Sequence, residues 1–536
     1  MQRRESSYQN IQHQGSSIQH PGSSYDVIII GAGVGGLACA SLLAKAGMRI
    51  LVVEQSSRPG GYVGSFKRGG FTFDCAAHFV TGCHEDGVIG KLLRELGIEK
   101  EIEFIKVEAP VKFIFPDFEF SFSLNDLDDG ERIIKERFPQ EAENLDRYKE
   151  TLSKIGQDII KLSSSFPIWK IPFFPMLFPA LLKHRNYTVR KLMDKCFTDE
   201  KLKTILSISP VTVPPSKASL LMAAGLEVES QEARVYYPRG GMQSFADVLV
   251  KGLRKYKGEL LLNTLVTKIL IDRGRVQGVK LADGRRIKAT YVVSNASLTQ
   301  TFYELIGKEQ LMKRFIKKID KKELSLSCFI LYLGIDMDLK SLGLNSYISV
   351  YPTYDSERQY ALWKAGEMPE EFSFVINISS LLDPITAPKG MHALTITIAA
   401  PYHYHKDWGT RDGGKVEYKR LKENIMQRMI EKAEKIIPGL SSHIIYREAA
   451  TPITLERHTL NTQGAMYGLA ATPKQIGPGR FKNRTPIKGL YLVGHYTYVA
   501  HGIGAVTHSG RAVADMITKR YTKDVQPVLP VTPVSP

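Results

Sequence analysis

The chain has 536 residues, 43% of them hydrophobic, and carries a formal net charge of +17. This length is too great for one ordinary core and indicates two or three domains. Five scattered cysteines without CxxC spacing argue against a disulfide framework or structural zinc, and basic residues spread along the chain without a recognisable module argue against nucleic-acid binding.

The two ends of the chain are polar or proline-rich. Residues 1–24 are rich in Gln and Ser and contain no apolar region of a secretory signal, which predicts a disordered leader. Residues 521–536 include a proline-rich stretch and predict a disordered tail. No stretch reaches the roughly 20 uninterrupted apolar residues of a spanning helix. We therefore expect a cytoplasmic protein, with peripheral membrane contact left open.

The first predicted elements are a strand, a tight glycine turn, a helix and a second strand within residues 25–54. In the motif Gly31-x-Gly33-x-x-Gly36, the first glycine permits the turn. The second lets the backbone approach a pyrophosphate, and the third lets helix and strand pack closely. Glu54 follows the turn by about 20 residues, as expected for a carboxylate that accepts from a ribose 2′-OH. The unit predicts binding of the ADP half of a dinucleotide, and the carboxylate disfavours NADP.

The sequence pattern and composition of residues 60–185 change several times along the chain. Gly60-Gly61 marks a loop whose backbone is expected to approach a neighbouring group closely. Residues 71–74 begin an alternating strand. Residues 85–160 have a helical, charged pattern. Residues 166–185 then combine aromatic side chains with four prolines, which forbid a continuous spanning helix. This segment is either an internal cap or an aromatic surface that dips into the lipid interface, with Lys183, His184 and Arg185 as headgroup anchors.

A second α/β pattern indicates that the chain returns to the dinucleotide domain from Tyr236. We expect a helix over 244–255, a hairpin at 272–274, a turn at 283–284 and a buried strand at 291–293. Residues 300–450 indicate a separate sheet domain with one long covering helix. Its expected elements are strands at 328–335, 347–350, 372–378 and 394–399 and a helix over 418–433.

The C-terminal motif indicates the cofactor. A strand at 490–493 ends at Gly494, and Gly502-Ile503-Gly504 opens a helix rich in small residues. NAD needs no such second element far along the chain, whereas FAD has a ribityl chain and flavin ring that extend away from its ADP. The helix N-terminus could stabilise negative charge at N1–C2=O of a reduced flavin.

These motifs occur in the same order in one family. The chain resembles the phytoene desaturase family of FAD-dependent flavoproteins, with the carotenoid cis–trans isomerases and retinol saturases as close relatives. The resemblance implies an α/β fold: a Rossmann-like FAD-binding domain of the glutathione reductase type, with an inserted α+β substrate domain. It assigns 25–90, 231–300 and 480–520 to FAD, 91–230 to a helical, membrane-facing substrate region, and 301–479 to a mixed-sheet substrate domain.

The resemblance also implies which residues contact the cofactor. They are Gly31, Gly33, Val34 and Gly36 in the pyrophosphate turn, Glu54 at the ribose, Gly61 and Tyr62 in the Gly-Gly loop, Val266 at the adenine, and Gly494, Ile503 and Val506 along the ribityl and flavin half. Two positions depart from the family's pattern. Tyr62 stands where many members have Arg, a departure shared by isomerases and saturases, and His495 stands where relatives often have Asp.

The implied activity is that of an FAD-dependent oxidoreductase that desaturates, saturates or isomerises the carbon–carbon double bonds of a hydrophobic polyene, a carotenoid or retinoid. The enzyme would take this substrate from a membrane surface. The alternatives are a flavin-dependent amine oxidase on the same scaffold and a binding protein in which FAD is structural.

No catalytic residue, metal ligand set or electron partner is assigned. His78 could reach the flavin face but is expected to be a packed histidine, and His403-x-His405 lacks a third metal ligand and is expected in a loop. His495, His501 and His508 crowd the predicted flavin end, where structural roles are at least as reasonable.

Overall fold

The computed structural model describes residues 24–108, 110–163, 172–207, 213–232, 234–411, 414–498 and 501–525. The predicted leader up to residue 23, the tail from 526, and residues 166–171 of the proline-aromatic segment lie outside the described residues.

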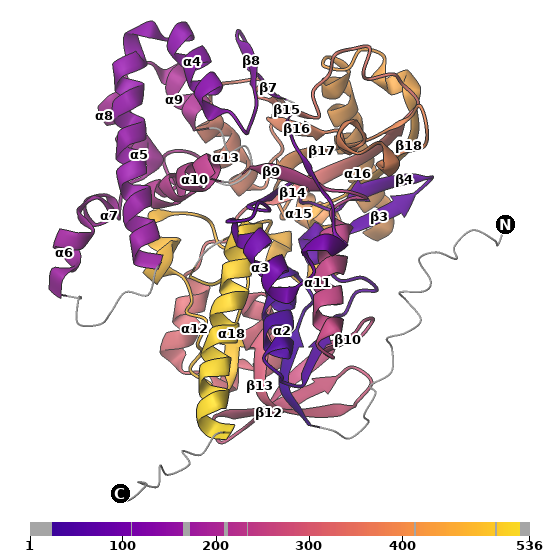
Figure 1. The fold of residues 1–536 in the computed structure, drawn as a ribbon. Coiled ribbons are helices and arrows are strands. Elements are labelled where there is room, and N and C mark those ends of the chain that lie inside the picture. The colour runs from indigo at the N-terminus through magenta and orange to yellow at the C-terminus, as the bar shows by residue number, and fades with distance from the viewer. Residues whose placement is uncertain are drawn as a thin grey trace, which may run out of the picture.

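One seven-stranded sheet is assembled from three separate parts of the chain (Figure 1). Its parallel part runs in the order β10 (Glu259–Leu261), β2 (Ile50–Val53), β1 (Tyr25–Ile30), β13 (Arg286–Ser294) and β19 (Leu490–Leu492). The antiparallel strands β12 (Arg275–Leu281) and β11 (Val266–Asp272) extend it beside β13. Strands β1 and β2 are nearly continuous apolar runs, as expected when both faces of a parallel sheet are covered.

Helices cover one face of this sheet, and a close glycine contact joins two of them. They are α2 (Val34–Lys45), α3 (Val88–Leu96), α11 (Gln243–Lys255) and α18 (Ile503–Val525). A Cβ on Gly510 would lie 2.5 Å from the carbonyl oxygen of Gly35, so α18 can cross α2 at this distance only because position 510 is a glycine. Apolar residues of β11–β13, of the π-helical turn Gln300–Ile306 and of α12 (Lys313–Asp320) pack on the other face.

A second seven-stranded sheet forms the core of the region that was predicted to be the substrate domain. Its order is β18 (Ile444–Ala450), β14 (Ser327–Ile335), β17 (His392–Ala400), β16 (Phe374–Asn377), β15 (Tyr347–Val350), β7 (Val111–Ile114) and β8 (Glu119–Phe122). The long helix α16 (Gly414–Glu434) packs on it through Leu421, Ile425 and Met429. The expected strands and covering helix of this region are thus present, with shifts of a few residues at their ends.

The helical pattern expected over 85–160 is wrong between residues 104 and 122. Strand β6 (Phe104–Lys106) pairs with β9 (Val235–Pro238), and the β7–β8 hairpin joins the second sheet through β15. The alternating aromatic residues of this hairpin stack across it, with Phe113 and Phe120 ring centres 5.3 Å apart. The second sheet therefore draws strands from both predicted substrate regions, and the boundaries proposed for those regions remain a prediction.

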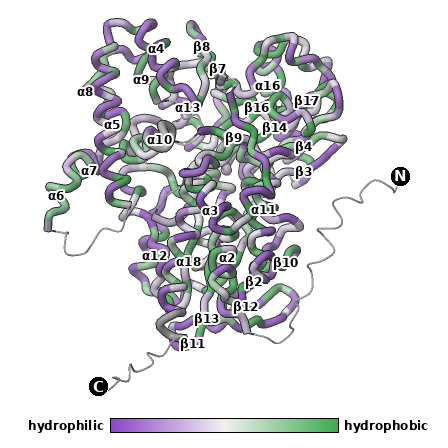
Figure 2. Tube along the Cα trace, in the orientation of Figure 1, coloured by the Kyte–Doolittle hydropathy of each residue, from purple (hydrophilic) through white to green (hydrophobic). Residues whose placement is uncertain are grey.

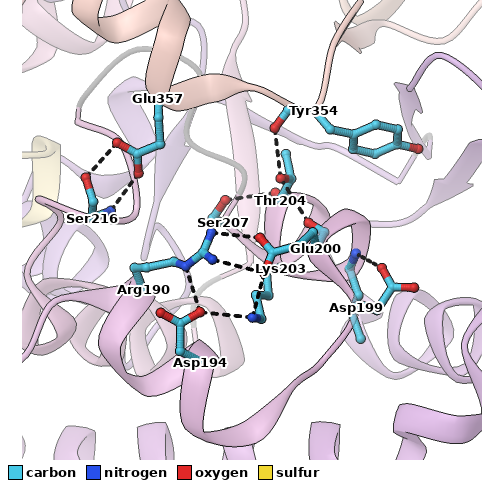
Figure 3. Close-up of polar contacts among 11 residues, drawn as sticks. Arg190, Asp194, Asp199, Glu200, Lys203, Thr204, Ser207, Ser216, Tyr354 and Glu357 are labelled. Atoms are coloured by element: carbon cyan, nitrogen blue, oxygen red, sulfur yellow. Dashed lines mark hydrogen bonds and ion pairs between the residues drawn. The ribbon is translucent and has the colours of Figure 1, made fainter.

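A group of helices lies beside the second sheet and packs on its β7–β8 hairpin through apolar side chains. They are α4 (Leu127–Arg137), α5 (Ala142–Ser163), α8 (Val189–Cys196), α9 (Glu200–Leu206) and α10 (Leu220–Glu232), with α13 (Ser356–Ala365) on the sheet side. Polar contacts join two of these helices to each other and to a neighbouring loop (Figure 3). Lys203, only 8% exposed in its side chain, pairs with Asp194 and Glu200. Thr204 donates to the carbonyl oxygen of Tyr354 at 3.0 Å and so connects α9 to the loop before α13.

Two short hydrophobic helices, α6 (Phe174–Leu177) and α7 (Pro179–His184), lie at the outer edge of this group of helices (Figures 1 and 2). Phe173, Met176 and Leu177 are 50%, 71% and 37% exposed, whereas Phe178 is buried. His184 is also buried, and its Nδ1 lies 2.8 Å from the carbonyl oxygen of Ala180. The expected headgroup role of His184 is therefore wrong.

Among the described residues, no helix is long and apolar enough to span a bilayer.

Candidate functional site

The carboxyl ends of the parallel strands meet at one cavity. Gly31 follows β1, Glu54 follows β2 by one position, Asn295 follows β13, and Gly494 comes shortly after β19; all four line the same cavity. Parallel α/β sheets place ligand sites at this edge because the strand ends and the following helix N-termini converge there. The fold thus brings together residues more than 450 positions apart.

Most of the predicted cofactor residues line this cavity. They are Gly31, Gly33, Val34, Glu54, Gly61, Tyr62, Val266, Gly494, Ile503 and Val506. Gly36 is the exception. A Cβ at Gly36 would lie 2.3 Å from the carbonyl oxygen of Gly31, so this glycine allows the helix to pack against the turn, as expected from the motif. The contacts of all these residues with a cofactor remain a prediction.

Glu54 is held in a fixed orientation at one end of the cavity. Its Oε2 accepts from the amide of Ala32 at 2.7 Å and its Oε1 from the amide of Ser56 at 2.9 Å. The neighbouring wall is formed by Thr264, Leu265 and Val266. A carboxylate next to a largely apolar wall suits a ribose hydroxyl next to an adenine ring.

Asn295 lies at the centre of the glycine-rich turns and was missed by the sequence analysis. Its side chain is 2.7 Å from the position of a Cβ on Gly33 and 2.7 Å from that of a Cβ on Gly494. Its main-chain N–H donates to the carbonyl oxygen of Ile30 at 2.9 Å. The available signal was its position directly after an apolar strand that we expected in the nucleotide domain.

The two positions that depart from the family's pattern meet at the other end of the cavity. The side-chain amide of Asn461 donates to the Tyr62 hydroxyl at 3.0 Å and lies 3.3 Å from Nε2 of His495. Asn461 Oδ1 accepts from the Tyr496 hydroxyl at 2.8 Å, and Tyr62 donates to the carbonyl oxygen of Ala465 at 3.1 Å. Asn461 therefore joins three cavity-lining segments. This role of Asn461 could not be predicted, because the residue lies in an irregular segment that was assigned to the substrate domain.

This end of the cavity carries no titrating charge near neutral pH. Burial, with a smaller contribution from Arg480, lowers the pKa of His495 to about 4. The same two causes, followed by His495, lower the pKa of His501 to about 3. Burial raises the pKa of Tyr62 to about 12. Among the described lining residues, Glu54 is the only acid, and none is Lys or Arg.

The other histidines considered in the sequence lie apart from the cavity wall. Nε2 of His78 is buried without a hydrogen-bond partner in the described part of the chain, and burial lowers its pKa to about 4. His403 contacts Asp407 at 2.6 Å and Gln463 at 3.0 Å, and His508 is exposed on α18. Over the described ranges, no three His, Cys, Asp or Glu residues are grouped to hold a metal ion.

The residues present fit FAD. A side chain at Gly33 would fill the turn beside Asn295, and Nδ1 of His501 is buried at the opposite end without a partner among the described residues. The cavity connects these ends and passes the N-terminus of α18. A long ligand with an anionic middle and a polar ring would satisfy the turn amides, the helix N-terminus and this nitrogen.

Comparisons with known proteins agree with this fit. The family model for flavin-containing amine oxidoreductases matches residues 34–301. A phytoene desaturase (neurosporene-forming) from Rhodobacter capsulatus is 29% identical, covering 91% of this chain and 93% of the relative. A chloroplastic prolycopene isomerase from Arabidopsis thaliana is 30% identical, covering 91% and 82%.

Two further matches extend the comparison. An all-trans-retinol 13,14-reductase from Macaca fascicularis is 25% identical, covering 90% of this chain and 83% of the relative. The solved cyclohexylamine oxidase from Brevibacterium oxydans shares the fold at a TM-score of 0.61 and 16% identity, covering 93% and 99%. The resemblance and the α/β flavoprotein fold predicted from the motifs are confirmed.

Proposed function

This chain belongs to the flavin-containing amine oxidoreductase family and is an FAD-dependent oxidoreductase, and we propose that it acts on the carbon–carbon double bonds of a polyene lipid. The observation that carries the proposal is the similarity, over nine-tenths of the chain, to proteins named for a carotene desaturase, a carotene isomerase and a retinol reductase. The reaction would be desaturation, saturation or cis–trans isomerisation of a carotenoid or retinoid.

The chemistry of the cavity supports an apolar substrate over an amine. Ala76, Ala77, Met466 and Tyr467 line the cavity together with the neutral histidines, away from Glu54. An ammonium group brought into this part would lose its hydration without a carboxylate among the described lining residues to replace it, which is costly. A polyene has no such requirement. Amine oxidation remains the second candidate, because the matching family model is that of flavin-containing amine oxidoreductases.

The chain's own residues would bind and orient the reactants. FAD, when bound, supplies the hydride or electron exchange with the carbon–carbon bond. The glycine turn and Glu54 would fix the ADP half, while Asn461 holds Tyr62 and His495 in place at the other end. The apolar side chains would exclude water from the reacting carbons.

Product analysis tests the substrate class. The flavin-loaded protein is incubated with liposomes that contain a carotenoid or a retinoid, under oxidising and reducing conditions, and the lipids are separated by chromatography. We expect a new polyene with a changed number or geometry of double bonds. Turnover of primary or secondary amines with hydrogen peroxide release, and none of any polyene, would favour the second candidate.

We further propose that α6 and its neighbours form a membrane-contacting surface through which the polyene enters. Phe173, Met176 and Leu177 are exposed together, and Lys183 and Arg185 are exposed nearby. Apolar side chains flanked by cations are suited to a bilayer interface with anionic lipids. The net charge of +17 supports this attraction.

Replacing Phe173, Met176 and Leu177 together by Ser should weaken binding to anionic liposomes without loss of FAD. Burying each such side chain contributes about 1.5–3 kcal/mol, so three losses should be visible in co-sedimentation. The matched control replaces Met312, Ile385 and Val416, which are 49%, 62% and 80% exposed elsewhere, by Ser. Equal liposome binding by both triple variants would contradict the proposed surface.

A further inference from the structure

Arg480 carries a guanidinium group in the interior of the FAD-binding domain. The residue is 0% exposed. Its Nε donates to the carbonyl oxygen of Gln475 at 2.8 Å, one Nη donates to that of Leu469 at 3.1 Å, and the other donates to that of His495. Within the described ranges no carboxylate pairs with it, and its hydrogen-bond acceptors are neutral main-chain carbonyl groups.

A charged group in the protein interior carries a free-energy cost. Moving an ion out of water costs several kcal/mol in proteins even after relaxation, and buried charges are ordinarily paired for that reason. Burial lowers the pKa of Arg480 to about 10, which still leaves the guanidinium charged at neutral pH. The charge itself therefore calls for an explanation.

The positive charge acts on the cavity. Arg480 bonds directly to the main chain of His495, which lines the cavity next to Gly494. Its charge is a cause of the lowered pKa of both His495 and His501, which lie on the cavity wall. The Asn461 network, which includes His495, consists of neutral groups and supplies no compensating negative charge.

A second source of positive potential lies at this end of the cavity. The N-terminus of α18, a helix of 23 residues, lines the cavity with Ile503 and Val506. Helix N-termini carry a partial positive charge of roughly half an elementary charge. The guanidinium and the helix therefore produce a positive potential at one end of the cavity, while Glu54, the one acid among the described lining residues, lies at the other.

We propose that Arg480 is a built-in positive charge that stabilises the negative charge FAD gains on reduction, and thereby raises the reduction potential of the bound flavin. The inference rests on the proposed function only in so far as FAD is the ligand of this cavity. It assigns Arg480 an electrostatic role, exerted through the His495 segment, rather than contact with the substrate. It explains why an unpaired guanidinium is retained beside this wall.

A redox titration of the flavin-loaded protein against reference dyes, without any polyene, tests the proposal. Arg480→Gln keeps a donor but removes the charge and should shift the flavin equilibrium toward the oxidised form by about tenfold, which is about 30 mV for a two-electron couple. Arg480→Lys keeps the charge and should stay near the wild-type potential. Lys322→Gln is the control, since Lys322 bonds to the nearby Gly479 carbonyl but does not line the cavity. It should leave the potential unchanged.

An unchanged potential in flavin-loaded Arg480→Gln overturns the proposal. If that variant does not hold FAD, the reduction potential of FAD bound to the wild-type protein is compared with that of free FAD. A higher potential in the bound state supports the role of Arg480, and an equal or lower one refutes it. A protein that turns over no polyene but shows the expected shifts would contradict the proposed substrate and leave the role of Arg480 supported.

Discussion

The Gly33→Val protein is expected to be purified without the yellow colour of bound FAD. A Cβ at Gly33 would lie 2.7 Å from the side-chain amide of Asn295, and the remaining valine atoms would extend into the turn where the pyrophosphate is expected. Losing two hydrogen bonds from turn amides to a charged group, at about 1.5–3 kcal/mol each, lowers affinity by at least about a hundredfold. Absorbance at the flavin maximum relative to protein absorbance measures the effect.

Gly225→Val is the matched control for this change. Gly225 lies in α10, and a Cβ there meets nothing within 4 Å. The control should retain the flavin content of the wild type, and circular dichroism should show that both variants are folded. A folded Gly33→Val protein with a full complement of FAD would contradict the assignment of this turn to the pyrophosphate.

The nucleotide half of the site was predictable because local sequence determines it. A strand, a glycine turn and a helix within 30 residues are specified by periodicity and by the steric needs of the turn, and Glu54 follows at a fixed distance along the chain. The C-terminal strand, Gly494 and the start of α18 were predictable for the same reason. Each of these elements carries its own signal, and parallel pairing brings their ends together.

The parts that were missed depend on contacts between distant segments. Asn461 reaches Tyr62 over 399 positions and His495 over 34, and its own neighbourhood has no regular pattern. Arg480 resembles any surface arginine in the sequence, and only the fold buries it. The β7–β8 hairpin was not predicted, because charged helical patterns precede and follow it in the sequence, although its aromatic residues alternate with the period of a strand.

The segment at residues 166–185 shows a different difficulty. Its composition fits both a buried cap and a membrane-contacting surface, and the described part contains some of each. Phe178 packs inside, with its ring centre 4.7 Å from that of Phe174, while Met176 points outward. Helical spacing on such short helices cannot be read from composition when prolines interrupt it.

Gly494→Val is expected to lower the affinity for FAD more than the affinity for ADP. Gly494 adopts a φ of +90°, which costs a branched side chain about 1–2 kcal/mol, and a Cβ there would lie 2.7 Å from Oδ1 of Asn295. The obstruction lies beside the proposed ribityl and flavin half, whereas the adenosine end is formed by Glu54, directly after β2, and by Val266, at the start of β11. Calorimetric titration of the apoprotein with FAD and with ADP separates the two halves.

Gly284→Val separates backbone strain from cavity obstruction. Gly284 has nearly the same φ, +91°, but a Cβ there meets nothing within 4 Å, and the residue lies in the turn between β12 and β13. This control should lose a similar amount of stability in thermal unfolding and keep its FAD affinity. If Gly494→Val instead weakens ADP and FAD by the same factor, the C-terminal segment acts on the common pyrophosphate turn through Asn295. The flavin half would then have to lie against another wall of the cavity.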